Sequence, residues 1–600
     1  MTIVKRGVPY ALSCIVVALS ACGGGGGGNG PVWFPPAPAP SPAPPPSPPP
    51  PAPAPAPAIP LSCNDLSGMA IPAAAIGLPT TGGTVTAATV VAASGTGATA
   101  IPEHCLVAGS IAPVDSAATP ILFKLALPTQ WNSKVVMFGG GGLNGTIPNI
   151  AGNVPAGPFN MATPLGRGYA TFASDSGHQA NALGSLDGRF GANDEAVANF
   201  GGEALKKTRD ASLFLLKARY AVSKAEKSYF AGGSTGGREA LQAIQQWPAD
   251  WDGAIVLFPA WNNLSAWIAG HRISKALAQP GAYPNQAKRA LLTKAALQAC
   301  DALDGVNDNL ISDQKRCNAV FDPSTAMVGG APLACVGGGD AGDTCLSAAQ
   351  IDALKLIDRG ASFNFALASG ETGYPGANVW GSDLGINNPA YPAVSPTVTF
   401  LGLGTSQPVS PMPLTAPYIS QMLDQLIKFM VTRDPTYDSL AFDSENPGAY
   451  LPRLSDLSAR FDGKTDISAF VARGGKLLLA HGKSDVLVTT RTSELYYQRL
   501  QTQLGAEKVN SFARYYEVPG YGHAVSTAFN LSWDSLTTME QWVEQGVAPT
   551  GQVATDTLGV PGRTRPMCDY PKWPKYNGTG DVNLAASFSC ADPTAVPAPT

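Results

Sequence analysis

The stretch Tyr229–Leu241, YFAGGSTGGREAL, is the part of the sequence that most strongly indicates a fold. Apolar residues typical of a buried strand lead into glycines around Ser234, and a helical pattern follows. Gly232 and Gly236 complete the pattern G-x-S-x-G, in which a sharp strand-to-helix turn holds a serine out as a nucleophile. A flexible glycine loop is the alternative interpretation, but the strand before the serine and the helix after it favour the turn.

Strand and helix patterns alternate on both sides of this stretch. A long amphipathic helix is expected over residues 193–220, while residues 260–473 break the alternation with loops, helices and few strand signals. The arrangement predicts an α/β-hydrolase fold with a mostly parallel sheet. Its catalytic domain would comprise residues 61–259 and 474–600, interrupted by a lid domain at residues 260–473. Strands are expected at TPILFKLALP, KVVMF, GYATFA, KSYFAG, DGAIVLFPA, KLLLA and RYYEV.

The N-terminus has the pattern of a bacterial export signal. MTIVKR is basic, and the apolar stretch after it is too short to span a bilayer. LSAC, at residues 19–22, is similar to a lipobox, so residues 1–22 are interpreted as a lipoprotein signal peptide that leaves Cys22 lipidated. An ordinary signal peptide cut nearby is the alternative. Residues 23–60, rich in glycine and then proline, are expected to form a disordered linker. We therefore expect export to the bacterial periplasm or cell surface, as an outer-membrane lipoprotein held only by this anchor.

The composition disfavours nucleic-acid and zinc ligands and suggests disulfide bonds. A net charge of −4 with 14% charged residues offers no basic surface for a nucleic-acid backbone. Apart from Cys14 and Cys22, the chain has eight cysteines, an even number that suggests disulfides in an exported protein. No CxxC motif is present, which disfavours a zinc site. Pairing of neighbours is the simplest arrangement and predicts the bonds Cys63–Cys105, Cys300–Cys317, Cys335–Cys345 and Cys568–Cys590.

A nucleophilic serine needs a base and an acid to orient that base. The chain has five histidines, and the hydrolase order of serine, acid and histidine selects His523, in a small-residue loop after a strand. His481, directly after another strand, is the alternative base. Asp485 follows that same strand, where a buried carboxylate would orient the imidazole, although a loop-capping aspartate is a common alternative. Ser234, Asp485 and His523 are therefore the candidate catalytic residues.

An oxyanion hole requires backbone N–H groups beside the nucleophile. Thr235, directly after the serine, can supply one. The glycine loop at residues 139–142 follows a predicted strand and can supply another, because glycine lets the backbone approach a substrate closely. Gly140 and Gly141 are the candidates in this loop, and a flexible tight turn is the alternative interpretation.

Eight segments of the chain together resemble one known family. They are FGGGGLNG, SDSGHQ, NDEAVANFGGEALKKT, YFAGGSTGGREAL, DGAIVLFPAWN, HGKSDVLV, PGYGH and RPMCDYPKWPKYNGTGD. The chain resembles the tannase and feruloyl esterase family, which includes the hydrolase of mono(2-hydroxyethyl) terephthalate, over about residues 63 to 590. The resemblance implies a secreted serine carboxylesterase acting on small esters of aromatic acids, such as feruloyl or galloyl esters. Two alternatives stay open: a terephthalate monoester hydrolase of the same family, and a surface lipoprotein that binds aromatic ligands without catalysis.

The resemblance also extends to a calcium loop. CDALDGVNDNLI, at residues 300–311, is similar to the loop with which this family binds a structural calcium ion. Hard oxygen donors clustered around a glycine suit calcium better than zinc, and a solvated acidic turn is the alternative. The ion would lie in the lid, beside the Cys300–Cys317 bond. The expected ligands are the carboxylates of Asp301, Asp304 and Asp308 and the carbonyls of Val306 and Leu310.

The chain departs from the family pattern at two positions. The resemblance implies a cysteine before the catalytic serine and another after the histidine, joined in a disulfide. Gly233 and Ala524 occupy these positions here. Because both cysteines are missing together, Ser234 and His523 are still expected to be neighbours. The hypothesis is that packing holds the two loops instead, with a looser site that is less stable to heat.

Substrate preference depends on the predicted lid. The terephthalate hydrolase is expected to bind a free carboxylate through a lid arginine, whereas residues 360–427 of this chain contain no Arg or Lys. Neutral phenolic esters are therefore expected, unless Arg433 or Arg453 reaches the site. Six aromatic residues of the insertion could line an aromatic pocket, although such residues more often form the core of a lid: Trp261, Trp267, Tyr374, Trp380, Tyr391 and Tyr418.

Overall fold

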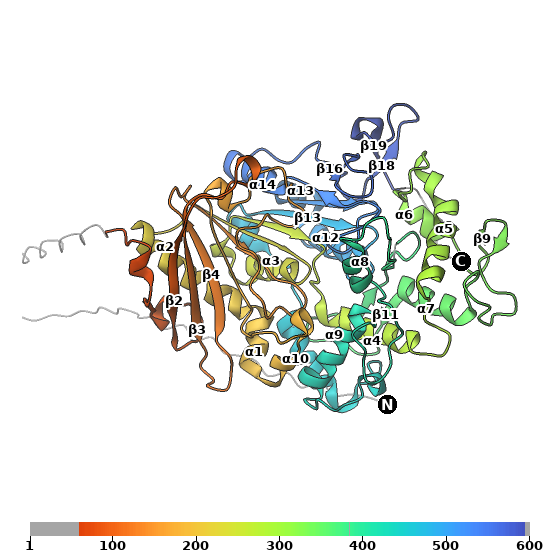
Figure 1. Cartoon of the computed structure of the whole chain (residues 1–600), viewed down its shortest axis with the longest axis horizontal. Coiled ribbons are helices and arrows are strands. Elements are labelled where there is room, and N and C mark those ends of the chain that lie inside the picture. Colours follow the sequence, from red (N-terminus) through yellow and green to blue (C-terminus); the bar gives the residue numbers. More distant parts are fainter. Residues whose placement is uncertain (1–58, 383, 594–600) are drawn as a thin grey trace, which may run out of the picture. The chain divides into compact units, whose positions relative to one another are not determined.

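A ten-stranded sheet, in the order β1-β2-β3-β4-β6-β5-β7-β8-β13-β14, organises the chain. The structure is a computed structural model that describes residues 59–382 and 384–593. In Figure 1, β2, β3 and β4 lie at the edge of the sheet farthest from the helices of residues 260–473, and β13 lies closer to those helices. The strands are β1 (Ala70–Ile71), β2 (Gly82–Val91), β3 (His104–Ala112), β4 (Ile121–Pro128), β5 (Lys134–Phe138), β6 (Ala170–Ser174), β7 (Lys227–Gly233), β8 (Gly253–Leu257), β13 (Lys476–Gly482) and β14 (Ala513–Val518).

The sheet has a parallel half and an antiparallel half. Strands β6, β5, β7, β8, β13 and β14 run parallel, as the alternation of strands and helices predicts. Strands β1 to β4 are antiparallel, and β4 joins the parallel half through an antiparallel pairing with β6. Strands β1, β2 and β3, which precede residue 119, were not predicted from the sequence. The segment GGTVTAATVV of β2 consists of small and β-branched residues. Its buried and exposed positions therefore differ little in hydrophobicity, and the sequence carries only a weak strand signal.

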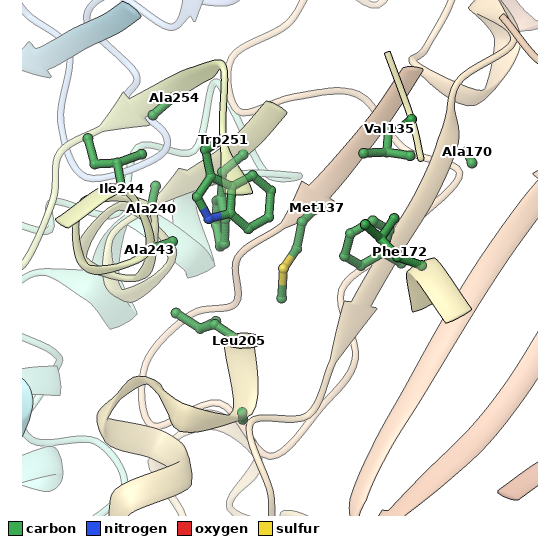
Figure 2. Packing of buried hydrophobic residues seen from close by; sticks show 14 of the residues in the cluster. Val135, Met137, Ala170, Phe172, Leu205, Ala240, Ala243, Ile244, Trp251 and Ala254 are labelled. Atoms are coloured by element: carbon green, nitrogen blue, oxygen red, sulfur yellow. The ribbon is translucent and has the colours of Figure 1, made fainter. Parts of the chain in front are cut away.

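Both faces of the parallel half are buried, and alternate residues of one strand enter different cores. Val135 and Met137 of β5 pack into a core with helix α2 (Ala204–Tyr220) and helix α3 (Thr235–Gln246), while Val136 and Phe138 face a second core. Figure 2 shows Met137 between Trp251, Leu205 and Phe172 in the first core. Helix α14 (Ser535–Gln545) packs into the second core, so helices cover both faces of the sheet around Ser234.

The long helix predicted over residues 193–220 is interrupted, and the prediction of one continuous helix is wrong. Helix α1 (Asp194–Ala198) passes into a π-helical turn, Asn199–Glu203, before α2 begins. Gly202 has φ +139°, which a helix does not allow and which glycine adopts without a Cβ clash. The hydrophobic spacing alone does not reveal this break.

Residues 260–473 contribute no strand to the ten-stranded sheet in the described part of the chain. They form helices, drawn in green to cyan in Figure 1, around one hydrophobic cluster of their own and a second cluster that they share with buried residues between positions 143 and 200. Four short strands in this segment make two separate pairs: β9 (Met327–Val328) with β10 (Ala331–Pro332), and β11 (Gly360–Ser362) with β12 (Gly373–Pro375). The helices are α4 (Asn263–Leu277), α5 (Gln286–Cys300), α6 (Gln314–Val320), α7 (Ala348–Arg359), α8 (Ser395–Leu401), α9 (Tyr418–Gln425), α10 (Leu451–Phe461) and α11 (Ser468–Ala472).

The C-terminal part adds helices to both faces of the sheet. Helices α12 (Thr490–Leu504) and α13 (Ala506–Phe512) connect β13 to β14. Two small antiparallel sheets follow, one of three strands and one of two. They comprise β15 (Leu531–Ser532), β16 (Val553–Asp556) and β17 (Thr564–Pro566), and β18 (Trp573–Tyr576) with β19 (Phe588–Ala591).

The predicted disulfide pairing is confirmed. The four bonds are Cys63–Cys105, Cys300–Cys317, Cys335–Cys345 and Cys568–Cys590. Gly233 and Ala524 have no sulfur and take no part in them. Cys22, the predicted signal and nearly all of the linker lie outside the described residues. None of the helices in the described part of the chain is long and apolar enough to cross a membrane.

Candidate active site

Ser234 lies in a strained turn between β7 and α3. Its φ of +58° with ψ −125° is a conformation that non-glycine residues rarely adopt. The flanking glycines are required by space: a Cβ on Gly232 would lie 2.1 Å from the carbonyl oxygen of Gly236. A Cβ on Gly236 would lie 2.7 Å from the carbonyl carbon of Gly139. The turn therefore has the geometry that G-x-S-x-G predicts, and α3 begins at the residue after the serine.

The structure brings Ser234, His523 and Asp485 together, although 289 positions separate the serine from the histidine. His523 Nε2 lies 3.0 Å from Ser234 Oγ, and His523 Nδ1 lies 2.7 Å from Asp485 Oδ2. A carboxylate only accepts hydrogen bonds, so the Nδ1 of His523 carries a proton and its Nε2 can accept the serine proton. Asp485 follows β13 and His523 follows β14, so the ends of neighbouring parallel strands position both side chains.

Asp485 is fully buried, and its carboxylate is held by several donors. The N–H groups of Leu487 and Val488 donate to Oδ1 at 2.9 Å each. Burial alone would raise the pKa of Asp485, but His523 and His481 beside the carboxylate hold its pKa well below the usual range. The carboxylate therefore stays ionised and can stabilise a positive charge on His523.

His481, the alternative base, contacts the acid and not the serine. Its Nε2 lies 2.8 Å from the carbonyl oxygen of Val488 and 3.2 Å from Asp485 Oδ2, and its Nδ1 lies 2.8 Å from Ser493 Oγ. A carbonyl oxygen only accepts, so Nε2 carries the proton. His481 is thus a fully buried partner of Asp485, and His523 is the histidine within hydrogen-bond distance of Ser234.

The two predicted glycine donors of the oxyanion hole differ in the structure. The N–H of Gly140 donates to Glu239 Oε2 at 2.9 Å and is not available to a substrate, so this prediction is corrected. The N–H groups of Gly141 and Thr235 have no acceptor among the described residues. The glycine loop lies against the turn at Ser234, since Gly236 N–H donates to Gly140 O at 2.8 Å.

A cavity opens beside His523 and continues into the inserted segment. Leu401, Gly402, Val486 and Leu487 line both the small cavity at His523 and a larger, mostly aliphatic cavity. Of the six aromatic candidates, Tyr374 lines the larger cavity and Tyr391 lines a separate one. The other four are buried in hydrophobic clusters: Trp261, Trp267, Trp380 and Tyr418.

The arginines near the cavity differ from the expected ones. Arg433 and Arg453 both pair with Asp194 and are not among the lining residues of the cavity. Arg272, on helix α4, does line it, and its Nε lies 3.0 Å from Glu445 Oε1. Arg272 was not expected, because the predicted carboxylate-binding arginines all lay after position 360.

Glu239 is a second residue that the sequence analysis missed. It lies on α3, five positions after the serine, and is 2% exposed. A charged residue on the buried face of the helix that follows a nucleophile is a signal that could have indicated it. Its position next to the glycine loop depends on tertiary packing.

The acidic loop at residues 301–310 has donor chemistry that suits a hard cation. Asp304 is fully buried, and its Oδ2 has no hydrogen-bond partner. Burial raises the pKa of Asp304 to about 7, and the negative charges of Asp308 and Asp301 add to this effect. Asp308 pairs with Arg565. No group of three or more His, Cys, Asp or Glu side chains within residues 59–382 and 384–593 forms a metal site by itself, so an ion here would need backbone carbonyls as well.

Comparisons with known proteins identify the family. The sequence pattern named "Tannase and feruloyl esterase" matches residues 105–591. An uncharacterized esterase of Agrobacterium fabrum is 36% identical, covering 88% of this chain and 93% of the relative. The mono(2-hydroxyethyl) terephthalate hydrolase of Piscinibacter sakaiensis is 32% identical, covering 83% of this chain and 86% of the relative.

Solved structures support the fold. Feruloyl esterase B of Aspergillus oryzae is similar with a TM-score of 0.67 and 22% identity, covering 88% of this chain and 100% of that one. A tannin acyl hydrolase of Aspergillus niger has a TM-score of 0.61 and 21% identity, covering 85% and 92%. The fold is therefore that of an α/β-hydrolase, as the sequence predicts. The chain belongs to the tannase and feruloyl esterase family and is a carboxylic ester hydrolase.

Proposed function

We propose that the chain is an exported serine carboxylesterase that hydrolyses esters of aromatic acids through an acyl-enzyme on Ser234. The hydrogen-bonded series from Ser234 through His523 to Asp485 carries this proposal. A serine hydroxyl is a weak nucleophile until a neighbouring base removes its proton, and His523 Nε2 is within reach of that proton.

The proposed reaction has two acyl-transfer steps. Ser234 Oγ attacks the ester carbonyl carbon while its proton moves to His523 Nε2, and Asp485 stabilises the resulting imidazolium. The N–H groups of Thr235 and Gly141 would bind the oxyanion that forms on the carbonyl oxygen. His523 then gives the proton to the leaving alcohol. Water, activated by the same histidine, hydrolyses the acyl-enzyme and restores Ser234.

The acyl group is proposed to occupy the apolar cavity. Its lining is mostly aliphatic, with Tyr374 as an aromatic wall, and this surface suits a flat apolar ring. The names of the relatives support feruloyl or galloyl esters. Terephthalate monoesters are the second candidate, because Arg272 lines the same cavity and one relative bears that activity in its name. Non-catalytic binding of aromatic ligands by a surface lipoprotein is the third.

Calcium and a lipid anchor belong to the same proposal. A calcium ion would be held by Asp301, Asp304 and Asp308 with the carbonyls of Val306 and Leu310. The orphaned buried oxygen of Asp304 supports a cation at this place. The ion would supply charge neutralisation in the inserted segment and takes no part in the reaction. Lipidation at Cys22 rests on the sequence of the first residues.

Labelling with a fluorophosphonate tests the proposed chemistry without assuming a substrate. The oxidised, calcium-loaded chain is treated with the probe, and peptide mass spectrometry locates the adduct. We expect an adduct on Ser234 that is absent in His523→Ala. Feruloyl, galloyl and terephthalate esters then separate the substrate classes, with Arg272→Ala as the variant that discriminates terephthalate. No adduct on folded protein would favour the binding function.

A further inference from the structure

The end of β8 is bonded to the backbone of the nucleophile on both sides. Ser234 N–H donates to the carbonyl oxygen of Leu257 at 3.1 Å, and Ala260 N–H donates to the carbonyl oxygen of Ser234 at 3.2 Å. Phe258 lies between these two anchors in the chain. Its backbone position is therefore coupled directly to that of the serine.

The side chain of Phe258 reaches from the serine side of the site to the histidine. A Cβ on Gly233 would lie 2.6 Å and 2.7 Å from Cε2 and Cζ of Phe258, so the ring occupies the room in which a side chain at 233 would stand. The centroids of the Phe258 and His523 rings are 4.9 Å apart, with 59° between their planes. Tyr521 packs on the same ring, with centroids 6.1 Å apart.

The ring has little freedom to move away. Phe258 is 4% exposed, and it contacts His481 as well as Tyr521 and His523. Its φ of +35° is rare for a residue with a side chain, and such strain persists only where the surroundings impose it. Its N–H donates to the carbonyl oxygen of Ala480 at 2.9 Å, which holds this conformation against β13.

We propose that Phe258 is a positioning residue that sets the imidazole of His523 against Ser234. In this chain, no disulfide can join residues 233 and 524, and the aromatic ring of Phe258 supplies the contact between the two loops. Gly233 is glycine because the ring needs its space. The proposal rests on the proposed function, since it assigns how the base of that reaction is oriented.

Removal of the ring should slow the chemistry more than it changes binding. Phe258 is not among the lining residues of the apolar cavity, so KM should change little. A displacement of the base by about 1 Å costs on the order of 100-fold in rate. We expect Phe258→Ala to lower both kcat for an activated ester and the rate of Ser234 labelling by about 10- to 100-fold. Phe258→Leu, which keeps part of the volume, should lose less.

The contact with Gly233 gives a sharper test. In Gly233→Ala the new methyl group collides with the ring and pushes it towards His523, so we expect a loss of about 10-fold or more in labelling rate. In Gly233→Ala with Phe258→Ala, the methyl group enters the space that the ring has left. The double variant should therefore label no more slowly than Phe258→Ala alone, whereas independent effects would multiply.

The chain contains a matched control pair far along the sheet. Gly109 on β3 lies directly opposite Phe123 on β4, and a Cβ on Gly109 would lie 2.4 Å from Cζ of Phe123. Gly109→Ala and Phe123→Ala create the same clash and the same loss of a buried ring. We expect them to lower Tm while leaving the labelling rate of the folded protein unchanged.

The outcomes separate this proposal from the proposed function. Labelling that depends on Ser234 and His523, together with wild-type kcat in Phe258→Leu and in Phe258→Ala, would overturn the role of Phe258 alone. Purely multiplicative effects in the double variant would overturn it as well. If Phe258→Ala does not fold, Phe258→Leu and Gly233→Ala carry the test. Absence of any labelling in the wild-type protein would instead contradict the proposed function.

Discussion

The carboxylate of Glu239 accepts a hydrogen bond from the backbone N–H of Gly140 at 2.9 Å and so ties the helix after Ser234 to the glycine loop. The other carboxylate oxygen accepts a hydrogen bond from the side-chain amide of Asn144 in the same loop. Burial raises the pKa of Glu239 above its usual value, while Arg238 and these two donors oppose the shift. Because Gly141 follows the anchored residue, Glu239 indirectly sets the position of the N–H that is proposed to bind the oxyanion.

We predict that Glu239→Ala lowers kcat by about 10- to 100-fold, less than the 100- to 1000-fold that follows from removing an oxyanion donor itself. KM should change little, because Glu239 does not line the cavity beside His523. Glu239→Gln keeps an oxygen acceptor for Gly140 and should lose less. Steady-state kinetics on an activated ester measures both constants, and equal kcat for Ala and wild type would refute the anchoring role.

Asp485→Asn is expected to lower kcat by about 10⁴-fold. An amide in place of the carboxylate cannot stabilise the imidazolium and can donate to Nδ1, which favours the wrong tautomer of His523. The fold should be retained, because the variant is isosteric. Asp466→Asn, an exposed aspartate beside α11, is the control and should keep wild-type kcat. A loss of less than 10-fold in Asp485→Asn would argue against this acid.

If the apolar cavity binds the acyl group, its size should determine which acyl groups the enzyme accepts. Ile273 is partly buried and lines the cavity from α4. Ile273→Trp should fill it and reduce kcat/KM for bulky aromatic esters by about 10-fold or more, since one or two misplaced methylene groups already cost that much. Acetyl esters and fluorophosphonate labelling should be spared. An equal loss for acetyl and aromatic esters would mean that the cavity does not bind the acyl group.

Calcium removal should lower thermal stability. A metal ion at a free concentration of 100 times its Kd for the folded state adds about 2.7 kcal/mol of stability, so we expect EGTA to lower Tm by about 2–3 °C in a domain of this size. Added calcium should restore it. Asp304→Asn should abolish the response to calcium, whereas Asp343→Asn, an exposed aspartate in another loop of the inserted segment, should keep it. A full calcium response in Asp304→Asn would place the ion elsewhere.

Asp462 predicts a pH dependence of stability. Burial raises the pKa of this carboxyl to about 7, against about 3.9 in an unfolded chain. The contribution of Asp462 to folding stability is therefore fully present below about pH 4. It is lost as pH rises through about 7, because the folded state must then bury the charged carboxylate. Asp462→Asn cannot ionise. The Tm of the variant relative to wild type should rise by several degrees between pH 5 and pH 8, and a constant difference would contradict the raised pKa.

Local patterns allowed much of the candidate site to be predicted. Ser234 lies in a strand-glycine-helix pattern, and Asp485 and His523 each follow an apolar strand, so the residue types and their order were sufficient to name them. The cysteine pairs were predictable because short separations along the chain made neighbours the simplest partners. The break at Gly202 and the strands before residue 119 were missed, since weak or small-residue periodicity does not distinguish them.

The sequence by itself determined the α/β-hydrolase fold, the three residues of the proposed triad and the disulfide pairs, because each depends on a local pattern or on chain order. Only the tertiary structure decided that the N–H of Gly140 is hydrogen-bonded to Glu239, that Arg272 lines the cavity, and that the ring of Phe258 fills the space beside Gly233. These contacts join residues far apart in the chain. They depend on van der Waals fit and hydrogen-bond geometry within a close-packed interior, which hydrophobic periodicity does not encode.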